Sequence, residues 1–170
     1  LYGDNFPSSR YEGDGLSPEK ARAVLESELK GYKRLGYNII RNAHAPTSPS
    51  LYEIADEIGI MIYDEWGWCF TKTLDEPAFE KNNLAEIEEW IYRDYNYPSV
   101  VMWSCGNEVV FKGNEEVARQ LDKQYDLVKK LDVSGRPAST FSGAGLWSHY
   151  GEERRKTDVA VASIQTVETS

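Results

Sequence analysis

The hydrophobic positions of this chain change their spacing at regular intervals. Residues 17–36 open with Ser-Pro, place apolar side chains on one helical face and end in glycine, which predicts a helix. The short apolar run at residues 37–41 follows and predicts a strand. The same order returns in a second Ser-Pro helix at residues 48–59 and a second strand at residues 60–64. The first part of the chain therefore alternates helix with strand.

The second half continues this alternation. Apolar residues at helical spacing predict helices around residues 84–91 and 117–131, and an uncharged run from Val100 to Trp103 predicts a strand between them. Further strand candidates are residues 1–6, 136–141 and 159–164. The alternation predicts an α/β fold with a parallel sheet inside its helices, as either a doubly wound sheet or a barrel. No glycine-rich phosphate loop follows the first strand, which argues against a dinucleotide-binding site.

The most informative segment is PSVVMWSCGNE, from Pro98 to Glu108. Its apolar run suits a strand that is buried on both faces, and Gly106 allows the backbone to turn before Asn107 and Glu108. A carboxylate at the end of such a strand is a candidate proton donor. The alternative is that Glu108 caps or precedes the helix that follows.

Polar side chains gather just after the predicted strands. One polar residue at a strand end is ordinary, but in a (β/α) barrel all these ends surround a single mouth. Arg41 is either a structural ion-pair partner or the residue that orients a catalytic carboxylate through a bidentate contact. His44 is either a hydrogen-bonded loop residue or a sugar contact. The full set is Asn5, Arg41, His44, Asp64, Glu65, Asn107, Glu108 and Gln165.

Other site chemistries find little support in the sequence. No His/Cys cluster has metal-ligand spacing, and Asp64 and Glu65 lack further ligands, so we expect neither a metal nor a cofactor. A serine hydrolase of the G-x-S-x-G type is also not indicated, because that motif is missing. Four tryptophans are either sugar-stacking platforms or core residues: Trp66, Trp68, Trp103 and Trp147. Acid/base chemistry by carboxylates remains.

Composition narrows the range of partners. The chain has 170 residues, 41% hydrophobic and 28% charged, which suits one globular core. Its net charge of −9 argues against a nucleic-acid partner. No apolar run approaches the ~20 residues of a membrane span, and no signal-peptide pattern opens the chain. We expect a soluble protein without a membrane partner, periplasmic or secreted only if a parent chain has a signal peptide. Cys69 and Cys105 leave the redox compartment open.

Three segments resemble glycoside hydrolase family 2, the family of β-galactosidases, β-glucuronidases and β-mannosidases. They are GYNIIRNAHAP at residues 36–46, LYEIADEIGIMIYDE at 51–65 and YPSVVMWSCGNE at 97–108. The family's catalytic domain has an Arg-ended strand near His-x-Pro, an acidic-ended strand after D-E-x-G, and a W-S-x-G-N-E signature. The resemblance implies a (β/α)8 TIM barrel that cleaves terminal β-linked sugars with retention of configuration.

The resemblance also implies roles for individual residues. Glu108 would be the general acid/base, and Asn107 would bind the sugar 2-hydroxyl. Arg41 would support the carboxylate of the nucleophile, and His44 and Glu65 would lie around the sugar-binding mouth. Two departures concern substrate contacts: the family usually has His-Tyr-Pro at residues 44–46 and Asn-His-Pro at 96–98, where this chain has His-Ala-Pro and Asn-Tyr-Pro.

No residue of this chain matches the nucleophile of the family pattern. The family carries it as a Glu after the seventh barrel strand, whereas residues 158–165 match the sixth. A TIM barrel typically needs ~250 residues. We therefore expect residues 1–170 to be a single partial barrel domain with six strand-helix units, without the family's N-terminal β-sandwich domains and last barrel strands. Such a fragment would be inactive alone, and its partners would be a carbohydrate and the rest of the parent polypeptide.

Three alternatives stay open. Glu65 is an in-chain rival for the nucleophile, because its strand should adjoin that of Glu108, and Glu168 is a weaker rival. The chain could also belong to a catalytically silent barrel that binds carbohydrate. A purely structural segment of a larger assembly is the third possibility.

Overall fold

The computed structural model describes residues 1–6, 15–68, 78–109, 115–140 and 158, and within them strands alternate with helices as predicted. The first strand lies near the N-terminus, and one strand follows each helix. In chain order the elements are β1 (Gly3–Phe6), α1 (Pro18–Arg34), β2 (Ile39–Asn42), α2 (Pro49–Ile58), β3 (Met61–Glu65), α3 (Phe79–Asp94), β4 (Val100–Ser104), α4 (Glu115–Leu131) and β5 (Ala138–Ser139).

All five described strands belong to one parallel sheet, in the order β1-β2-β3-β4-β5. Each strand thus lies beside the strand that precedes it in the chain, as in a TIM barrel. In a doubly wound sheet the strand order would reverse at a switch point. The structure therefore decides between the two architectures in favour of the barrel, and the carboxyl ends of the strands lie along one edge of the sheet.

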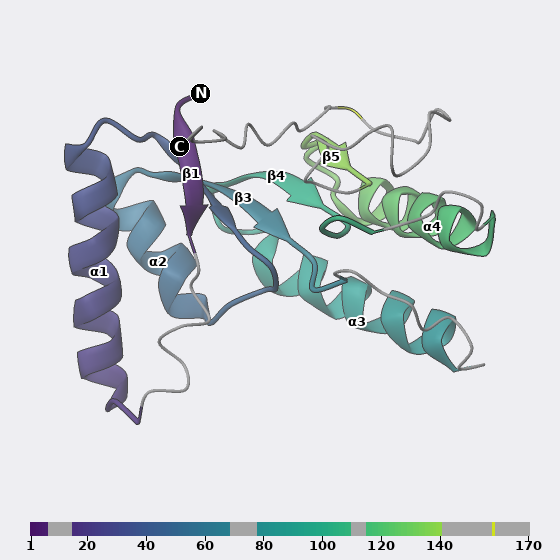
Figure 1. Cartoon of the computed structure of the whole chain (residues 1–170), viewed down its shortest axis with the longest axis horizontal. Helices are drawn as coiled ribbons and strands as arrows, with labels where there is room; N and C mark the ends of the chain where they lie inside the picture. Colours follow the sequence, from purple (N-terminus) through teal and green to yellow (C-terminus); the bar gives the residue numbers. More distant parts are fainter. Residues whose placement is uncertain (7–14, 69–77, 110–114, 141–157, 159–170) are drawn as a thin grey trace, which may run out of the picture.

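The helices begin and end where local sequence signals place them. Ser17 caps α1 by accepting the backbone N–H of Lys20 at 3.5 Å, and Pro18 occupies the first turn. Gly59 ends α2 in the left-handed conformation at φ 70°. Figure 1 shows α1 and α2 as one neighbouring pair and α3 and α4 as another. In the part of the chain that the structure describes, no helix is long and apolar enough to cross a membrane.

The main core fills the layer between the sheet and its helices. Strand residues Ile40, Ile62 and Trp103 are fully buried there against helix residues such as Leu29 and Ile87. These strand side chains occupy one face of the sheet because side chains alternate along a strand. The opposite face, toward the barrel interior, is left for the residues between them.

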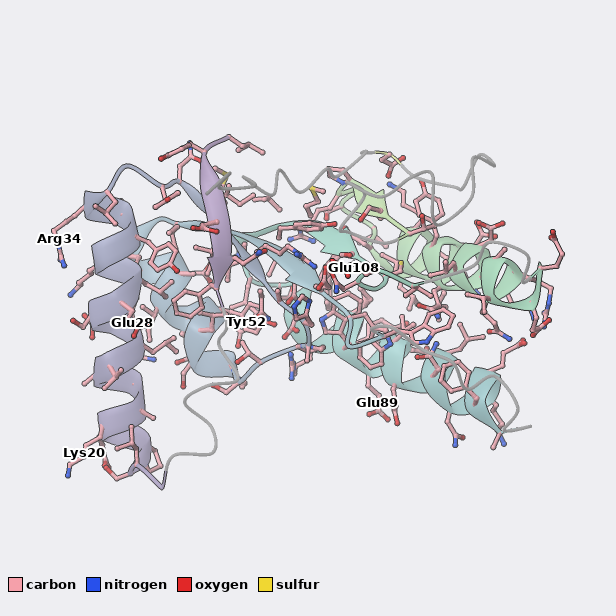
Figure 2. All side chains as sticks on the ribbon, in the orientation of Figure 1. Lys20, Glu28, Arg34, Tyr52, Glu89 and Glu108 are labelled. Atoms are coloured by element: carbon pink, nitrogen blue, oxygen red, sulfur yellow. The ribbon has the colours of Figure 1, made fainter. Side chains whose placement is uncertain are left out.

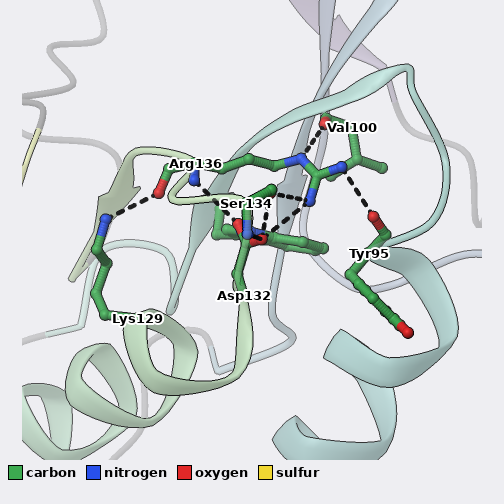
Figure 3. Close-up of polar contacts among 7 residues, drawn as sticks. Tyr95, Val100, Lys129, Asp132, Ser134 and Arg136 are labelled. Atoms are coloured by element: carbon green, nitrogen blue, oxygen red, sulfur yellow. Dashed lines mark hydrogen bonds and ion pairs between the residues drawn. The ribbon is translucent and has the colours of Figure 1, made fainter.

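Arg136 joins the amino end of β4 to its surroundings (Figure 3). Its guanidinium donates to the carbonyl oxygens of Val100 at 2.6 Å and Tyr95 at 2.8 Å. It also pairs with the carboxylate of Asp132 at 3.1 Å. The contacts lie at the amino ends of the strands, the end that TIM barrels use for stability. They connect α3, β4 and the turn after α4.

Several strand boundaries differ from the sequence prediction, among them those of β2 and β5. Strand β2 starts at Ile39 rather than residue 37, because the N–H of Tyr37 still donates to Tyr32 in the turn that ends α1. Among the described residues of the predicted strand at 136–141, β5 comprises Ala138–Ser139. The predicted strand at 159–164 lies outside the described residues, as do Cys69, Trp147, Gln165 and Glu168.

Candidate functional site

The inner face of the sheet carries a row of polar side chains near the carboxyl ends of the strands. Asn5 and Arg41 are in register on β1 and β2, and Arg41 is in register with Tyr63 on β3. Glu65 lies two residues beyond Tyr63 and so shares its face. The alternation of side chains along these three strands brings the groups together without any loop.

Arg41 and Glu65 form a buried ion pair. The Arg41 Nε donates to Glu65 Oε2 at 2.9 Å, and Nη2 donates to Oε1 at 2.7 Å. The Glu65 side chain is fully buried. A bidentate pair of this kind fixes both side chains in one orientation. Removing either partner would leave a charge in a site that water reaches poorly.

Two asparagines extend this pair across the sheet. Arg41 Nη2 also donates to Asn107 Oδ1 at 2.6 Å, and Nη1 donates to Asn5 Oδ1 at 3.0 Å. The guanidinium thereby connects β1, β2, β3 and the loop after β4. We call Asn5, Arg41, His44, Glu65 and Asn107 the Arg41 cluster.

His44 is the most exposed member of the Arg41 cluster. Its Nδ1 lies 3.3 Å from Glu65 Oε1, and its side chain is 49% exposed. Because a carboxylate oxygen can only accept, this contact requires the proton on Nδ1. In the neutral ring Nε2 is then the acceptor, which suits a contact with a ligand hydroxyl.

The loop after β4 is held against the loop after β3. The backbone N–H of Asn107 donates to Trp68 O at 2.9 Å. A Cβ on Gly106 would lie 2.7 Å from the same oxygen, so no larger residue fits there. The expected role of Gly106 was to let the backbone turn, but the close approach is the actual requirement, because the positive φ falls on Glu108.

Glu108 directly follows this junction. Its φ of 46° is unusual for a residue with a side chain, and such conformations cluster at functional sites. The residue is half-buried and lies in the middle of the molecule (Figure 2). Within the described ranges its carboxylate accepts no hydrogen bond, in contrast to Glu65. It is thus a carboxylate that the protein positions through the backbone and leaves available at its tip.

The structure brings together four of the five residues singled out from the sequence. Arg41, His44, Glu65 and Asn107 are connected by direct contacts, and Glu108 follows Asn107 without touching the others. The carboxylate that Arg41 contacts is that of Glu65.

Sequence reasoning missed the groups that lie deeper on the same face. Tyr63, which is in register with Arg41, shares its hydroxyl with Ser139 Oγ at 2.6 Å, and burial raises the pKa of Tyr63. The spacing of two between Tyr63 and Glu65 was the available signal, since it places both on one face.

Asp64 does not face the mouth as its place at a strand end suggested. It points into the layer between sheet and helices, where its carboxylate accepts from Asn42 Nδ2 at 3.0 Å, Tyr52 Oη at 3.0 Å and Trp90 Nε1 at 2.8 Å. Burial, followed by the nearby charge of Asp94, raises the pKa of Asp64 to about 7, although the three hydrogen bonds oppose this. We call Asp64 and these three donors the Asp64 cluster.

The described tryptophans differ in role. Trp103 is a core residue, fully buried, with Nε1 donating to Asp132 at 2.8 Å. Trp66 Nε1 donates to Asn83 Oδ1 at 2.9 Å. Among the residues that the structure covers, Cys105 is a buried free thiol, and no group of three or more His, Cys, Asp or Glu residues could hold a metal ion.

Comparisons with known proteins agree with this geometry. The family described as "Glycosyl hydrolases family 2, TIM barrel domain" matches residues 19–164. A putative beta-glucuronidase of Formosa agariphila is 36% identical over 138 residues, which are 74% of this chain and 13% of that protein. A beta-galactosidase of Aeromonas hydrophila subsp. hydrophila is 30% identical over 145 residues, 81% of this chain and 13% of that protein. The chain thus spans about an eighth of the length of these relatives.

Solved structures show the same relationship. The β-glucuronidase of Ruminococcus gnavus bound to D-glucaro-d-lactam superposes with a TM-score of 0.66 and 27% identity, over 81% of this chain and 23% of that one. The apo structure of the same protein gives a TM-score of 0.65 and 26% identity. Family match, strand order and structural similarity lead to one conclusion: the chain belongs to the TIM-barrel domain family of the glycosyl hydrolases family 2.

Proposed function

We propose that this chain supplies the acid/base half of the active site of a retaining β-glycosidase, with Glu108 as the proton donor. The contact between Arg41 and Asn107 is the observation that carries the proposal. It ties the residue before Glu108 to three strands of the barrel, so that the carboxylate of Glu108 is held at the mouth while its own oxygens accept no hydrogen bond from the described residues.

The proposed mechanism assigns one task to each group. Glu108 protonates the glycosidic oxygen as the bond breaks, and its carboxylate then takes a proton from the attacking water. Arg41 holds Asn107 Oδ1, which turns the Nδ2 donor of that amide away from Arg41 and toward the proposed contact with the sugar 2-hydroxyl. His44 offers Nε2 to a second hydroxyl.

Glu65 is poorly suited to be the nucleophile. Both of its oxygens accept hydrogen bonds from Arg41, and one of them also contacts His44. A nucleophile needs a carboxylate oxygen within reach of the anomeric carbon, ~5 to 5.5 Å from the acid/base. We therefore place the nucleophile in sequence that follows Ser170, as the family resemblance implies, and expect the 170 residues alone to be inactive.

The proposed substrate is a terminal β-linked sugar. Relatives of this chain are named as β-glucuronidases and β-galactosidases, so glucuronides and galactosides are the first candidates. The segment His44-Ala45-Pro46 departs from the family's His-Tyr-Pro, which is a reason to test several sugars rather than to adopt one from a relative.

The test is the Glu108→Gln variant of the full-length protein, assayed on aryl β-galactosides and aryl β-glucuronides. Loss of the general acid should lower turnover by about 10² to 10⁴-fold. Glu89→Gln is a matched control, since Glu89 is exposed on α3 (Figure 2), and it should retain wild-type turnover. Equal turnover in wild type and Glu108→Gln would contradict the acid/base assignment.

The same experiment separates the enzyme from a silent carbohydrate-binding barrel. A wild-type protein that binds these sugars but hydrolyses none of them would favour the binding role. The continuation of the chain gives an independent indication: an apolar strand ending in Glu after Ser170 supports the enzyme, and a neutral residue in that place supports the binder.

A further inference from the structure

A pocket of about 350 Å³ lies beside the Arg41 cluster. Its walls come from Pro46 in the loop after β2, from residues 66–68 after β3, and from Phe79, Asn83 and Glu86 in the first turns of α3. Nothing in the proposed reaction so far uses this pocket.

The pocket shares its two loops with the candidate active site. A Cβ on Gly67 would lie 3.6 Å from Ala45 Cβ and 3.7 Å from His44 O, so the loops after β2 and β3 touch at His44. On the other side, Trp68 O accepts the backbone N–H of Asn107 at 2.9 Å. The pocket therefore adjoins both ends of the site, including the residue that precedes Glu108.

Two residues that line the pocket each carry a buried donor for which the described structure offers no acceptor. Trp68 is 4% exposed and Asn83 is 7% exposed. Within the described structure, neither Trp68 Nε1 nor Asn83 Nδ2 has a hydrogen-bond partner. The Asn83 amide cannot be reversed to resolve this, because its Oδ1 already accepts from Trp66 Nε1 at 2.9 Å. Buried donors in native proteins are nearly always paired, so two unpaired donors in one pocket indicate a missing acceptor.

The remaining walls define the ligand further. Trp68 packs against Phe79 with ring centroids 5.6 Å apart and the ring planes at 50°, so two aromatic side chains form part of the pocket wall. Glu86 is exposed at the rim and disfavours an anion. A planar, uncharged, largely apolar group that carries an acceptor oxygen fits this combination.

We infer that this pocket binds the leaving group of the substrate, and that an aryl aglycone with an acceptor oxygen is its preferred occupant. This inference rests on the proposed glycosidase function. The acid/base protonates the oxygen of the leaving group, so the leaving group must lie beside Glu108. The pocket lies next to this residue in the fold, because Trp68 O accepts the backbone N–H of Asn107, which precedes Glu108. Both unpaired nitrogen atoms are covered, so the ligand reaches them when the side chains that line the pocket shift.

The first experiment measures binding of 4-methylumbelliferone, a planar neutral leaving group with a carbonyl acceptor, to the full-length protein by calorimetry. Trp68→Phe removes one donor, and Asn83→Leu removes the other. Each variant should weaken binding about tenfold, the effect of one lost hydrogen bond to a buried donor. Asn82→Leu makes the same change at the neighbouring exposed position and should bind as wild type does.

The second experiment compares hydrolysis of a 4-methylumbelliferyl β-glycoside with that of the glycosyl fluoride of the same sugar. Fluoride is too small to occupy the pocket, so the ratio of the two kcat/KM values should fall about tenfold in Trp68→Phe and in Asn83→Leu. A uniform defect in folding or in acid/base positioning would lower both rates and leave the ratio unchanged. Circular dichroism identifies folded variants, and Trp68→Phe decides alone if Asn83→Leu does not fold.

The outcomes separate this inference from the proposed function. Weakened binding in the variants of a protein without hydrolytic activity would show that the pocket takes an aryl group, but it would refute the glycosidase and with it the leaving-group role. Active enzyme with no binding of 4-methylumbelliferone and an unchanged ratio would overturn the pocket alone. Preferential binding of a free sugar in the pocket would also overturn it, because the leaving-group site would then take carbohydrate.

Discussion

Asp64 and Glu65 are adjacent carboxylates on β3, both fully buried, and they are held in opposite ways. Glu65 faces the barrel interior and is paired with the guanidinium of Arg41. Asp64 faces the helices, where its hydrogen bonds come from the neutral donors Asn42, Tyr52 and Trp90. A shift of one residue along a strand therefore moves a carboxylate from a guanidinium partner at the barrel mouth to neutral donors under the helices.

The two faces of the sheet hold a buried carboxylate by different interactions. Between sheet and helices, burial and the charge of Asp94 favour the protonated form of Asp64, whose pKa is raised to about 7. At the mouth, Glu65 instead lies against a cation, the guanidinium of Arg41. The carboxylate on the inner face is thus held by a cation, whereas the Asp64 carboxyl under the helices is held by neutral donors and lies near a second acidic residue, Asp94.

The largest test of this comparison is Arg41→Met. It would leave Glu65 as an unpaired buried charge and should lower the free energy of unfolding by about 3–5 kcal/mol, together with turnover. Urea unfolding followed by tryptophan fluorescence measures the first effect, and a glycoside assay measures the second.

Arg93→Met is the matched change on the other face, since Arg93 pairs with the buried Asp94. It should cost less stability, because the Arg93 side chain is 40% exposed to water. It should also leave turnover unchanged. If the two variants lost turnover alike, the division between a functional and a structural face would be wrong.

A smaller effect is expected from pH acting on Asp64. Its pKa is raised from 3.8 to about 7, so between about pH 4 and pH 7 the folded protein keeps a proton that the unfolded chain has lost. Stability should therefore fall as the pH rises through this window. Asp64→Asn cannot titrate, and wild type should lose stability relative to it by as much as about 1 kcal/mol per pH unit.

Urea unfolding of both proteins at several pH values measures this difference. A constant gap between wild type and Asp64→Asn from pH 4 to pH 7 would show that the raised pKa is not expressed in stability. The sign of the change in unfolding free energy with pH is as informative as its size. A carboxylate held by a cation would give the opposite sign, with stability that increases as the pH rises.

The smallest expected effect belongs to Tyr52→Phe. It removes the hydroxyl, one of the three side-chain donors to Asp64, and should lower stability by about 1 kcal/mol. Because the lost bond favours the carboxylate, the pKa of Asp64 should rise further and the pH-dependent window should extend upward. Tyr92→Phe removes the hydroxyl of an exposed tyrosine on the same layer of helices and should change neither quantity.

Much of the fold could be predicted from the sequence because its signals are local. The Ser-Pro starts, the glycine ends and the apolar runs indicated α1, α2, β3 and β4 to within a few residues. The barrel order, by contrast, depends on which strands pair, and the hydrophobic pattern left two architectures open. The resemblance of three segments to glycoside hydrolase family 2 favoured the barrel before the structure was known.

The site could be predicted less completely, for a geometric reason. Arg41, Glu65 and Asn107 were named individually, but their mutual contacts depend on register between strands that are far apart in sequence. Asp64 was assigned to the mouth because it lies at a strand end. That position alone does not reveal toward which face of the sheet the side chain points. The pairing of Trp66 with Asn83 could not be anticipated, since it joins a loop to a helix turn through packing alone.

Arg136 has a consequence for how this barrel can vary. The two oxygen atoms that it binds on Val100 and Tyr95 belong to the main chain, which every amino acid provides. Positions 95 and 100 can therefore accept other residues without loss of these two bonds, provided the new side chains still pack. The amino end of β4 is thus anchored in a way that tolerates sequence drift, whereas contacts between side chains, as in the Arg41 cluster, require that both partners be retained.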